Sequence, residues 1–425
     1  MFFPMLKGTR LQRVTETKLP GLDRRESAAT PGFREMENLC SEGYPALRTR
    51  PGRGLVETLK KPNGLLAKDA LLWVDGKHLY MNGLEVGPEL TDGEKSLVSM
   101  GAYVVVFPDK VYVNTQDVTD CGSLECERTA PAGSGLALCD ETGTAYSGVT
   151  ESAGAPEEPR EGALWLDLSG TEPVLRQYSR EVWTALEGVC VKVQAAGIGT
   201  GFAAGDGVEV SGCSVARLNG ETVLQAADTD WVAFPGTVAG GAVTETAMKL
   251  RRFVPEMDYV VQSGNRLWGC KYGMVDGKPV NEIYASKLGD CKNWRCFAGL
   301  ATDSYAAARG SDGVFTGAVS YLGNPIFFKE RCMERVYASG SGAHQIVTTE
   351  CSGVQKGSAR SLQVVGGVLY YLSGDGVQAF DGSLPVCVSQ ALGAERYHGG
   401  VAGCWQEKYY LSALDREEKP SLLVY

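Results

Sequence analysis

The chain of 425 residues contains 54 glycines and 18 prolines and carries a formal net charge of −10. Its length exceeds that of one ordinary hydrophobic core, so we expect two or three domains. Glycine costs up to about 1 kcal/mol at a helix position, so this composition argues against a helical protein and favours an all-β chain rich in turns. The acidic balance argues against nonspecific nucleic-acid binding by the whole chain.

Residues 1–60 predict an extended N-terminal arm. Pro45 and Pro51 force an extended chain, because the residue before each proline is pushed out of the α region. Residues 1–61 contain twelve Lys/Arg and seven Asp/Glu, a net charge of +5, which leaves −15 for the remainder. Such asymmetry is more typical of a solvated surface than of a dedicated acidic partner. The candidate contact residues of this basic segment are Arg48, Arg50, Arg53, Lys60 and Lys61.

Residues 61–120 predict the first part of a repeated β-hairpin architecture. Ala70–Gly83 contains two apolar runs and ends in an Asn82-Gly83 turn. Leu97–Asn114 contains the continuous apolar run 103–107, which suits a strand buried on both faces.

The hairpin pattern stops at residues 121–250, which predict an insertion. Its first part, 121–182, is rich in Gly, Glu, Pro and Ser and is expected to be a flexible acidic loop. Its second part, about 183–243, contains short strand-like runs and predicts a small β-barrel or β-sandwich domain. Asn219-Gly220 gives the strongest hairpin signal in the chain, because both residues favour the positive φ angles of a two-residue turn.

The hairpins resume over residues 251–425. The clearest one, 364–382, has an apolar run, a Ser-Gly-Asp-Gly turn, a second short run and an Asp-Gly turn. Asp375 and Asp381 are expected to be turn formers rather than an acid pair. At about 40–45 residues per blade, the two hairpin-bearing segments predict a β-propeller of roughly five or six blades. The sequence stops within the apolar run 422–425, so either the N-terminal segment or a further segment would supply a closing strand.

No motif in the sequence predicts a catalytic residue, a cofactor-binding residue or a metal ligand, and we expect no enzyme. Gly199–Ala204 fits the loose dinucleotide pattern G-x-G-x-x-A, but another strand-like run follows instead of a helix, which favours a turn. The C-x4-C pairs Cys121/Cys126 and Cys291/Cys296 have no histidine close in sequence, which favours free thiols over zinc ligands. The serine-hydrolase pattern G-x-S-x-G is absent from the sequence.

The cysteine content also bears on the cellular compartment. Thirteen cysteines are scattered from Cys40 to Cys404, whereas disulfide frameworks belong to short secreted chains. This dispersal favours a protein assembled in a reducing cytoplasm. The first residues have no basic region before an apolar run, and Pro4 interrupts that run, so no secretory signal is expected. No stretch approaches the roughly 18 apolar residues of a membrane-spanning helix, so no membrane insertion is expected.

Five phrases follow one another in a consistent order: Phe33–Leu39, Pro45–Gly52, Glu282–Trp294, Pro325–Lys329 and Ser361–Gly382. In this order they resemble the neck and tail-nozzle β-propellers of bacteriophages. In that family, a phrase similar to the first two precedes the first blade. The resemblance covers residues 33–116 and 253–425, but it does not cover the insertion.

This resemblance implies a structural protein of the tailed-phage virion, of the portal-associated type that completes the head and stabilises packaged DNA. Such a protein forms a ring, often a hexamer, at the neck or tail nozzle below the portal, where it retains DNA and forms part of the ejection channel. The implied partners are further copies of the chain, the portal or an adaptor protein, other tail or fibre proteins, and the DNA in the channel. The implied location is the virion, assembled in the bacterial host cytoplasm.

The resemblance gives the basic residues of the arm a possible role, because arginine and lysine would contact a portal subunit or DNA phosphates. A solvated surface remains an equally good interpretation of these residues. The insertion departs from the family pattern and leaves open which tier of the neck or tail the chain would occupy. An alternative function is a β-propeller that binds glycans or a receptor at the tail, with or without glycan-cleaving activity.

Overall fold

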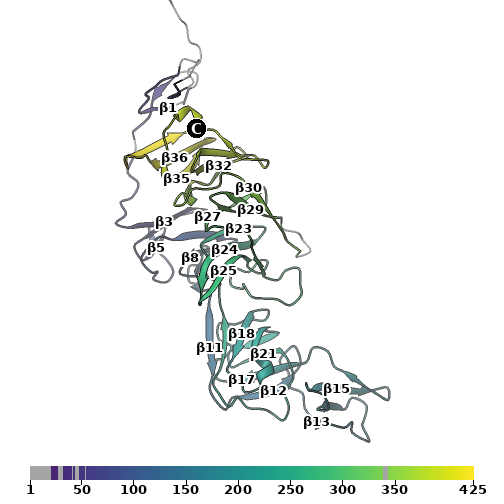
Figure 1. Ribbon diagram of the computed structural model, residues 1–425. Helices are drawn as coiled ribbons and strands as arrows, with labels where there is room; N and C mark the ends of the chain where they lie inside the picture. Colours follow the sequence, from purple (N-terminus) through teal and green to yellow (C-terminus); the bar gives the residue numbers. More distant parts are fainter. Residues whose placement is uncertain (1–20, 27–31, 41, 44–46, 53, 338–342) are drawn as a thin grey trace, which may run out of the picture. The chain divides into compact units, whose positions relative to one another are not determined.

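The computed structural model describes residues 21–26, 32–40, 42–43, 47–52, 54–337 and 343–425 (Figure 1). These residues form β-strands and three short 3-10 turns, with no α-helix among them, which confirms the expected all-β class. The chain divides into two compact units: Leu59–Glu350 forms one, and Met1–Thr58 with Cys351–Tyr425 forms the other.

The larger unit contains four sheets that each consist of four antiparallel strands consecutive in sequence. The first has β3 (Pro62–Ala67), β4 (Leu71–Asp75), β5 (His78–Met81) and β6 (Leu84–Glu85). The second has β7 (Ser96–Met100), β8 (Tyr103–Phe107), β9 (Val111–Asn114) and β10 (Cys121–Ser123). The third has β23 (Tyr259–Ser263), β24 (Arg266–Val275), β25 (Lys278–Ala285) and β26 (Tyr305–Ala308). The fourth has β27 (Phe315–Tyr321), β28 (Asn324–Lys329), β29 (Cys332–Tyr337) and β30 (Gln345–Glu350).

Tight two-residue turns hold several of these strand pairs in register. Between β5 and β6, Met81 pairs with Leu84, and Asn82 and Gly83 take φ angles of 50° and 86°. Positive φ at both turn residues matches the right-handed twist of the flanking strands. The predicted Asn-Gly turn is therefore confirmed.

Strand β8 explains how neighbouring sheets pack together. Val104 and Val106 belong to one hydrophobic core, shared with β4 and β5, whereas Val105 and Phe107 belong to another, shared with β23 and β24. Alternate side chains of a strand point to opposite faces, so β8 is buried between two cores. This confirms the expectation that the apolar run 103–107 is buried on both faces.

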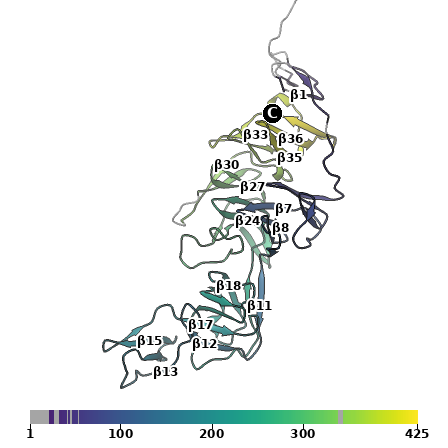
Figure 2. The ribbon, with the colours of Figure 1, turned by 180° about the vertical axis from the view of Figure 1, so that it is seen from behind.

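The smaller unit contains two further sheets of the same kind and a short strand pair (Figure 2). One sheet has four strands, β31 (Gln363–Val365), β32 (Val368–Ser373), β33 (Gly376–Phe380) and β34 (Val386–Cys387). The other has three strands, β35 (His398–Trp405), β36 (Lys408–Leu414) and β37 (Pro420–Val424). The short pair consists of β1 (Leu39–Cys40) and β2 (Arg48–Thr49).

The predicted hairpin over residues 364–382 is present in this unit. Ser373 pairs with Gly376 across the turn that joins β32 and β33. Asp381 accepts hydrogen bonds from the backbone N–H and the Oγ of Ser383, as expected of a turn residue. Asp375 accepts a hydrogen bond from Ser352 Oγ, so the two carboxylates bind separate local partners.

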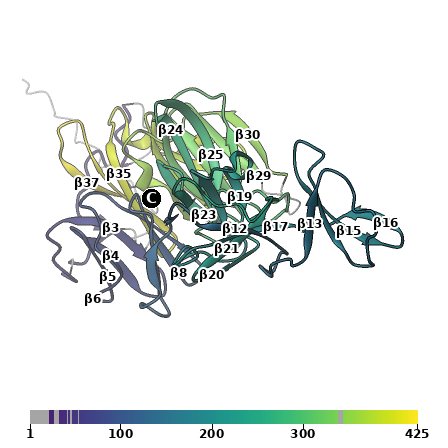
Figure 3. The ribbon, with the colours of Figure 1, turned by 90° about the horizontal axis from the view of Figure 1, so that it is seen from below.

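The insertion folds as three further sheets within the larger unit (Figure 3). One combines β11 (Cys126–Ala130), β22 (Met248–Arg252), β18 (Gly207–Ser211) and β19 (Gly220–Val223). The second combines β12 (Gly135–Cys139), β17 (Cys190–Gln194), β21 (Trp231–Pro235) and β20 (Ala226–Asp228). The third contains β13 (Val149–Ser152), β14 (Leu164–Asp167), β15 (Val174–Ser179) and β16 (Val182–Ala185), with β13 parallel to β14.

The expectation of a flexible acidic loop over residues 121–182 is wrong for most of that segment. It supplies strands β10 to β15, and irregular chain remains mainly over residues 140–148 and 153–163 between them. Strand β11 pairs with β22, where Glu127 faces Arg251 across more than a hundred residues of chain. The polar residues of β11 are stabilised by a strand distant in sequence, and the composition of the local segment cannot reveal that partner. The β module also includes residues outside 183–243, because β11, β12 and β22 complete its sheets.

The predicted Asn219-Gly220 hairpin turn is also wrong. Residues Ala216–Leu218 form a 3-10 turn, and β19 begins at Gly220. Asn219 instead closes the loop after β18: its Oδ1 accepts from the Cys213 N–H at 2.9 Å, and its Nδ2 donates to the Cys213 carbonyl at 2.8 Å. A side-chain amide that mimics a backbone pair favours Asn at this position without any two-residue turn.

A buried carboxylate stabilises the fourth sheet and provides the first prediction. Glu334 on β29 is fully buried and binds Arg309 Nε at 2.8 Å, together with the hydroxyls of Ser311 and Thr348. Glu334→Ala leaves the Arg309 guanidinium without its carboxylate, so we expect the free energy of unfolding to fall by roughly 3 kcal/mol. Chemical denaturation measures the loss. Glu89→Ala, which removes one partner of an exposed pair with Lys77, is the matched control and should cost less than about 1 kcal/mol. Equal losses would contradict the account.

Candidate functional site

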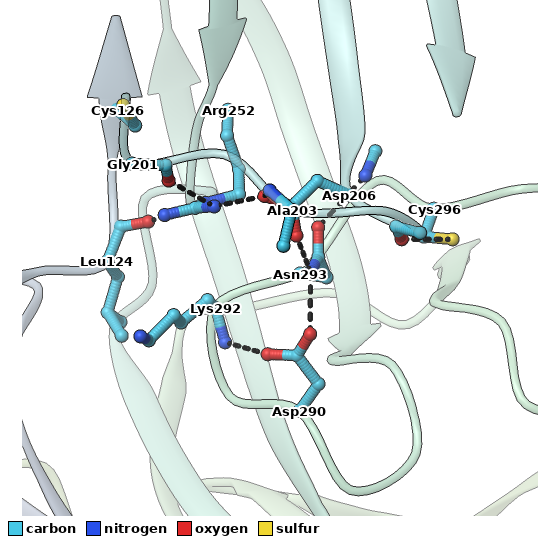
Figure 4. A network of polar contacts seen from close by, with 12 residues as sticks. Leu124, Cys126, Gly201, Ala203, Asp206, Arg252, Asp290, Lys292, Asn293 and Cys296 are labelled. Atoms are coloured by element: carbon cyan, nitrogen blue, oxygen red, sulfur yellow. Dashed lines mark hydrogen bonds and ion pairs between the residues drawn. The ribbon is translucent and has the colours of Figure 1, made fainter. Parts of the chain in front are cut away.

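The most elaborate polar site in the described chain joins the insertion to the loop between β25 and β26 (Figure 4). Arg252, at the end of β22, forms a buried ion pair with Asp206, the residue before β18. Asn293, from the loop after β25, donates its Nδ2 to Asp206 Oδ1 at 2.8 Å and accepts the Gly207 N–H at 2.9 Å. We call Asp206, Arg252 and Asn293 the junction triad.

Arg252 is the most connected member of the junction triad. Its Nε donates to the Leu124 carbonyl at 3.1 Å, and its Nη1 donates to the Gly201 carbonyl at 3.1 Å as well as to Asp206. Only 5% of Arg252 and 5% of Asp206 is exposed, so both charged groups are largely desolvated. A buried pair of this kind adds little net stability relative to an apolar replacement, but removing one partner leaves an uncompensated charge. The triad therefore fixes which backbone segments meet here.

Glycine allows the two segments to approach closely at the junction. A Cβ built on Gly207 would lie 2.2 Å from the carbonyl oxygen of Arg295, and neighbouring backbone atoms leave it no space to shift. Lys287 adds a further link, because its Nζ donates to the Gly205 carbonyl at 2.9 Å. The Gly199–Ala204 segment lies beside this contact and consists of turns and irregular chain rather than a helix start. It therefore lacks the helix N-terminus that a dinucleotide phosphate requires.

A cavity of about 330 Å³ adjoins the junction triad. Its walls include Phe202, Arg252 and Lys292, and the ammonium of Lys292 lies 4.1 Å from the centre of the Tyr112 ring. The full lining is Tyr103, Gly201, Phe202, Ala203, Asp206, Arg252, Gly289, Asp290, Cys291 and Lys292. The lining carries two acidic and two basic side chains, so it has no strong preference for ligands of one charge.

Burial acts on two thiols and a hydrogen bond acts on one phenol at or near this cavity. Burial raises the pKa of the Cys291 thiol to about 12, and burial also raises the pKa of Cys126 nearby. The thiolate is the nucleophilic form of cysteine, so both residues are unreactive thiols at neutral pH. A hydrogen bond to Asp120 raises the pKa of Tyr103, which keeps the phenol protonated. The contacts of the junction triad make the site a structural joint between the insertion and the loop after β25.

The paired cysteine motifs do not converge on a metal site. Cys121 pairs with Val113 and Cys126 pairs with Arg252, so the first two lie in different sheets. Cys296 is buried with its Sγ 3.5 Å from the Gly205 carbonyl. Among the residues that the structure describes, no group of three or more His, Cys, Asp and Glu side chains is placed to hold a metal ion. None of the described helical segments is long and apolar enough to cross a membrane.

The basic residues predicted as contacts fall into different units. Arg48 and Arg50 are exposed and belong to the smaller unit, with Arg48 on β2; Arg50 Nε donates to Asn38 Oδ1 at 3.0 Å. Lys60 and Lys61 are exposed and belong to the larger unit. Lys61 forms an ion pair with Asp92 at 2.7 Å, which compensates its charge locally. Arg53 lies outside the described residues.

Sequence reasoning missed the junction triad. Arg252 lies 46 residues and Asn293 lies 87 residues after Asp206, and each taken singly is an ordinary polar residue. One local signal was available: Gly205-Asp206-Gly207 interrupts the apolar pattern just before a strand. Glycine at such a position is typical of close backbone approach.

Substitution of Arg252 tests the joint. Arg252→Ala leaves Asp206 buried without its cation, so we expect the free energy of unfolding to fall by about 3–5 kcal/mol. Hydrogen exchange of the Gly207 amide, which donates to Asn293, should accelerate in the same variant. Arg251→Ala changes the exposed neighbour on the same strand and is the matched control, with an expected cost below about 1 kcal/mol. An Arg252→Ala variant as stable as Arg251→Ala would show that the ion pair does not anchor the insertion.

Comparison with protein-family models finds no match, and comparison with curated proteins finds none either. Among solved structures, the chain is similar to "Phage phi92 endosialidase", with 10% sequence identity and a TM-score of 0.20. The match covers 81% of this chain and 46% of that chain, so this chain spans less than half the length of the protein it matches. A likeness at this level identifies neither a family nor an activity.

Proposed function

We propose that this protein is a structural component of a tailed-phage virion and that its small sheets are the blades of a β-propeller. One observation carries the proposal. Outside the insertion, six sheets follow one another along the described chain, five with four strands and one with three, and each strand pairs with its neighbour in sequence. Such a succession of small antiparallel meanders is the element order of propeller blades. In this proposal, these sheets would supply the five or six blades expected from hairpin spacing.

The position in the virion is proposed from the order of the sequence phrases. They are similar to those of neck and tail-nozzle propellers, which supports a ring of copies, with six as the expected number, below the portal. In this role the ring would retain packaged DNA and line part of its exit path. The net charge of −10 suits a channel wall, because an acidic surface does not hold DNA phosphates during ejection.

A role in assembly rather than catalysis is supported by the chemistry of the junction. Its charged residues are bound to each other, and its thiols are protonated at neutral pH. The work would then be done by interfaces with other copies, with the portal or an adaptor, and with tail or fibre proteins. In the arm, Arg48 and Arg50 are the residues proposed to contact such a partner, because Lys61 already binds Asp92.

Molar mass measured by light scattering tests the ring. We expect the full chain to form a hexamer-sized particle, either alone or on addition of the portal or adaptor subunit of the same phage. Arg48→Glu with Arg50→Glu should weaken that assembly, because the variant presents negative charge where cations would contact the partner. Lys278→Glu, which reverses an exposed charge at the start of β25, is the matched control and should assemble normally. A chain that stays monomeric with and without the portal would contradict the proposal.

A second candidate function, glycan binding at the tail, is favoured by one feature of the insertion. Strands β14, β15 and β16 bring Trp165, Tyr178 and Trp183 together, with ring centres 5.2–5.4 Å apart. Arg176 lies over the Trp165 ring and binds Asp167, so polar groups border the aromatic ones. Aromatic faces bordered by polar groups suit the apolar and hydroxyl faces of a sugar ring.

Binding of the full chain to a glycan array tests this candidate. If the aromatic cluster binds sugar, Trp183→Ala should reduce the array signal at least tenfold, because it removes the partly exposed ring of the cluster. Tyr272→Ala alters a partly exposed aromatic residue on β24 and should leave the signal unchanged. The absence of any bound glycan, or equal signals from both variants, would rule the candidate out.

A further inference from the structure

Two cysteines lie opposite each other in the second sheet of the insertion. Cys139 is the last residue of β12, Cys190 is the first residue of β17, and the two are paired in the antiparallel register. Between them the chain makes one excursion, residues 140–189, which contains all of β13, β14, β15 and β16. The two cysteines therefore stand at the base of that excursion.

Both cysteine side chains point to the same face of the sheet. Leu138 precedes Cys139, Val191 follows Cys190, and both belong to the main core of the insertion. Because neighbouring residues of a strand point to opposite faces, the side chains of Cys139 and Cys190 face away from that core. There they form a small separate cluster with Ala233. Cys139 is 0% and Cys190 is 1% exposed, so the pair is enclosed although it lies off the main core.

The strand register brings the two Cα atoms within the range of a cross-strand disulfide. The Leu138 carbonyl accepts a hydrogen bond from the Tyr146 N–H, and the Asp140 N–H donates one to the Thr144 carbonyl. Successive residues of a strand direct their backbone groups to opposite sides, so the N–H and carbonyl of Cys139 point toward β17. Cys139 and Cys190 are thus a hydrogen-bonded pair, whose Cα atoms lie about 5.5 Å apart in antiparallel ladders. Disulfides accept Cα separations of roughly 4.4–6.8 Å, but their Cβ atoms lie about 3.5–4.5 Å apart, closer than most opposite residues in a sheet. A bond here would hold some strain and would be readily reduced.

A short turn covers the pair. Asp140 Oδ1 accepts from the backbone N–H groups of Thr142 and Thr144 and from Thr142 Oγ1, which closes the turn after β12. Lys192 Nζ donates to the Gly143 carbonyl and so fastens the tip of the turn to β17. Burial raises the pKa of Cys139 to about 12 and that of Cys190 to about 11, which keeps both thiols unreactive while the turn is closed. Ala226 and Trp231 of the neighbouring strands also pack against this cluster.

We propose that Cys139 and Cys190 are a modification site: they form a reducible disulfide that closes the base of the excursion carrying β13 to β16. The oxidant is a small-molecule disulfide of the glutathione type. When the turn opens, one cysteine loses its proton to solvent, and its thiolate attacks the small disulfide. A mixed disulfide forms and one small thiolate leaves, which takes up a proton. The second cysteine thiolate then attacks the protein sulfur of the mixed disulfide and releases the second small thiol. Two protein thiols are oxidised, and one small disulfide is reduced to two thiols.

The bond would act on one part of the molecule. It closes a chain loop that contains β13 to β16, so it restricts that segment in the unfolded and partly opened states. Other cysteine pairs close in sequence lack this arrangement, because Cys121 and Cys126 face Val113 and Arg252 in their ladders. Register thus selects one pair among the thirteen cysteines.

Peptide mapping of the full chain tests the proposal. The reduced protein is incubated with oxidised glutathione at pH 8, remaining thiols are alkylated, and the digest is analysed without reductant. We expect one dominant cross-linked species that joins the peptides of Cys139 and Cys190 and disappears on addition of dithiothreitol. Recovery of both cysteines as alkylated monomers, or cross-links spread over other cysteines such as the exposed Cys404, would overturn the proposal.

Two variants make the test independent of folding defects. Cys190→Ala fits a cluster that already contains Ala233, and it should abolish both the cross-linked species and the rise in melting temperature that oxidation gives to the wild type. Asp140→Ala removes the hydrogen bonds of the covering turn and leaves both cysteines in place. It should speed disulfide formation several-fold. If the rate is unchanged, or if oxidation shifts the melting temperature of Cys190→Ala as it does the wild type, the proposal fails.

Discussion

The buried contact between Arg252 and Asp206 constrains how the insertion meets the rest of the larger unit. Two strands of the insertion meet the remaining sheets here, and Arg252 binds backbone carbonyls on both sides, at Leu124 and at Gly201. Because each charge depends on the other for compensation, neither segment can move away without leaving a charge in a low-dielectric interior. Asn293 extends this constraint to the loop after β25. The ion pair therefore contributes specificity of arrangement more than net stability.

Neighbouring sheets of the larger unit share apolar cores and also exchange hydrogen bonds, such as the one between Ser320 of β27 and Ser263 of β23. Each is a small meander in which most strands are joined by short turns. Strand β8 shows how one strand supplies side chains to two successive cores. A chain built in this way can accept a large insertion between two sheets, provided that the entering and leaving strands are held together. Strands β11 and β22 meet that condition because they pair with each other directly. Local repetition and one long-range junction thus account for much of the architecture of the larger unit.

The sequence predicted the parts of the fold whose determinants are local. The turn at Asn82-Gly83, the doubly buried run 103–107 and the hairpin near residue 370 all depend on neighbouring residues, and all three are present. The polar strand β11 could not be predicted, because its partner strand β22 lies at the far end of the insertion. The prediction of a hairpin turn at Asn219-Gly220 was wrong, because the side-chain amide of Asn219 binds the backbone of Cys213 and closes a longer loop. The junction triad could not be predicted from the sequence either, because its three residues are distant in the chain and meet only in the folded insertion.

A double-mutant cycle on Asp206 and Arg252 tests the central claim most directly. The free energy of unfolding would be measured by denaturant titration for the wild type, Asp206→Asn, Arg252→Met and the double variant. If the ion pair anchors the insertion, the double variant is at least 1 kcal/mol more stable than the sum of the single losses predicts, because no uncompensated charge remains buried. Losses that add to within about 0.3–0.5 kcal/mol would show that the two side chains act independently and would contradict the account.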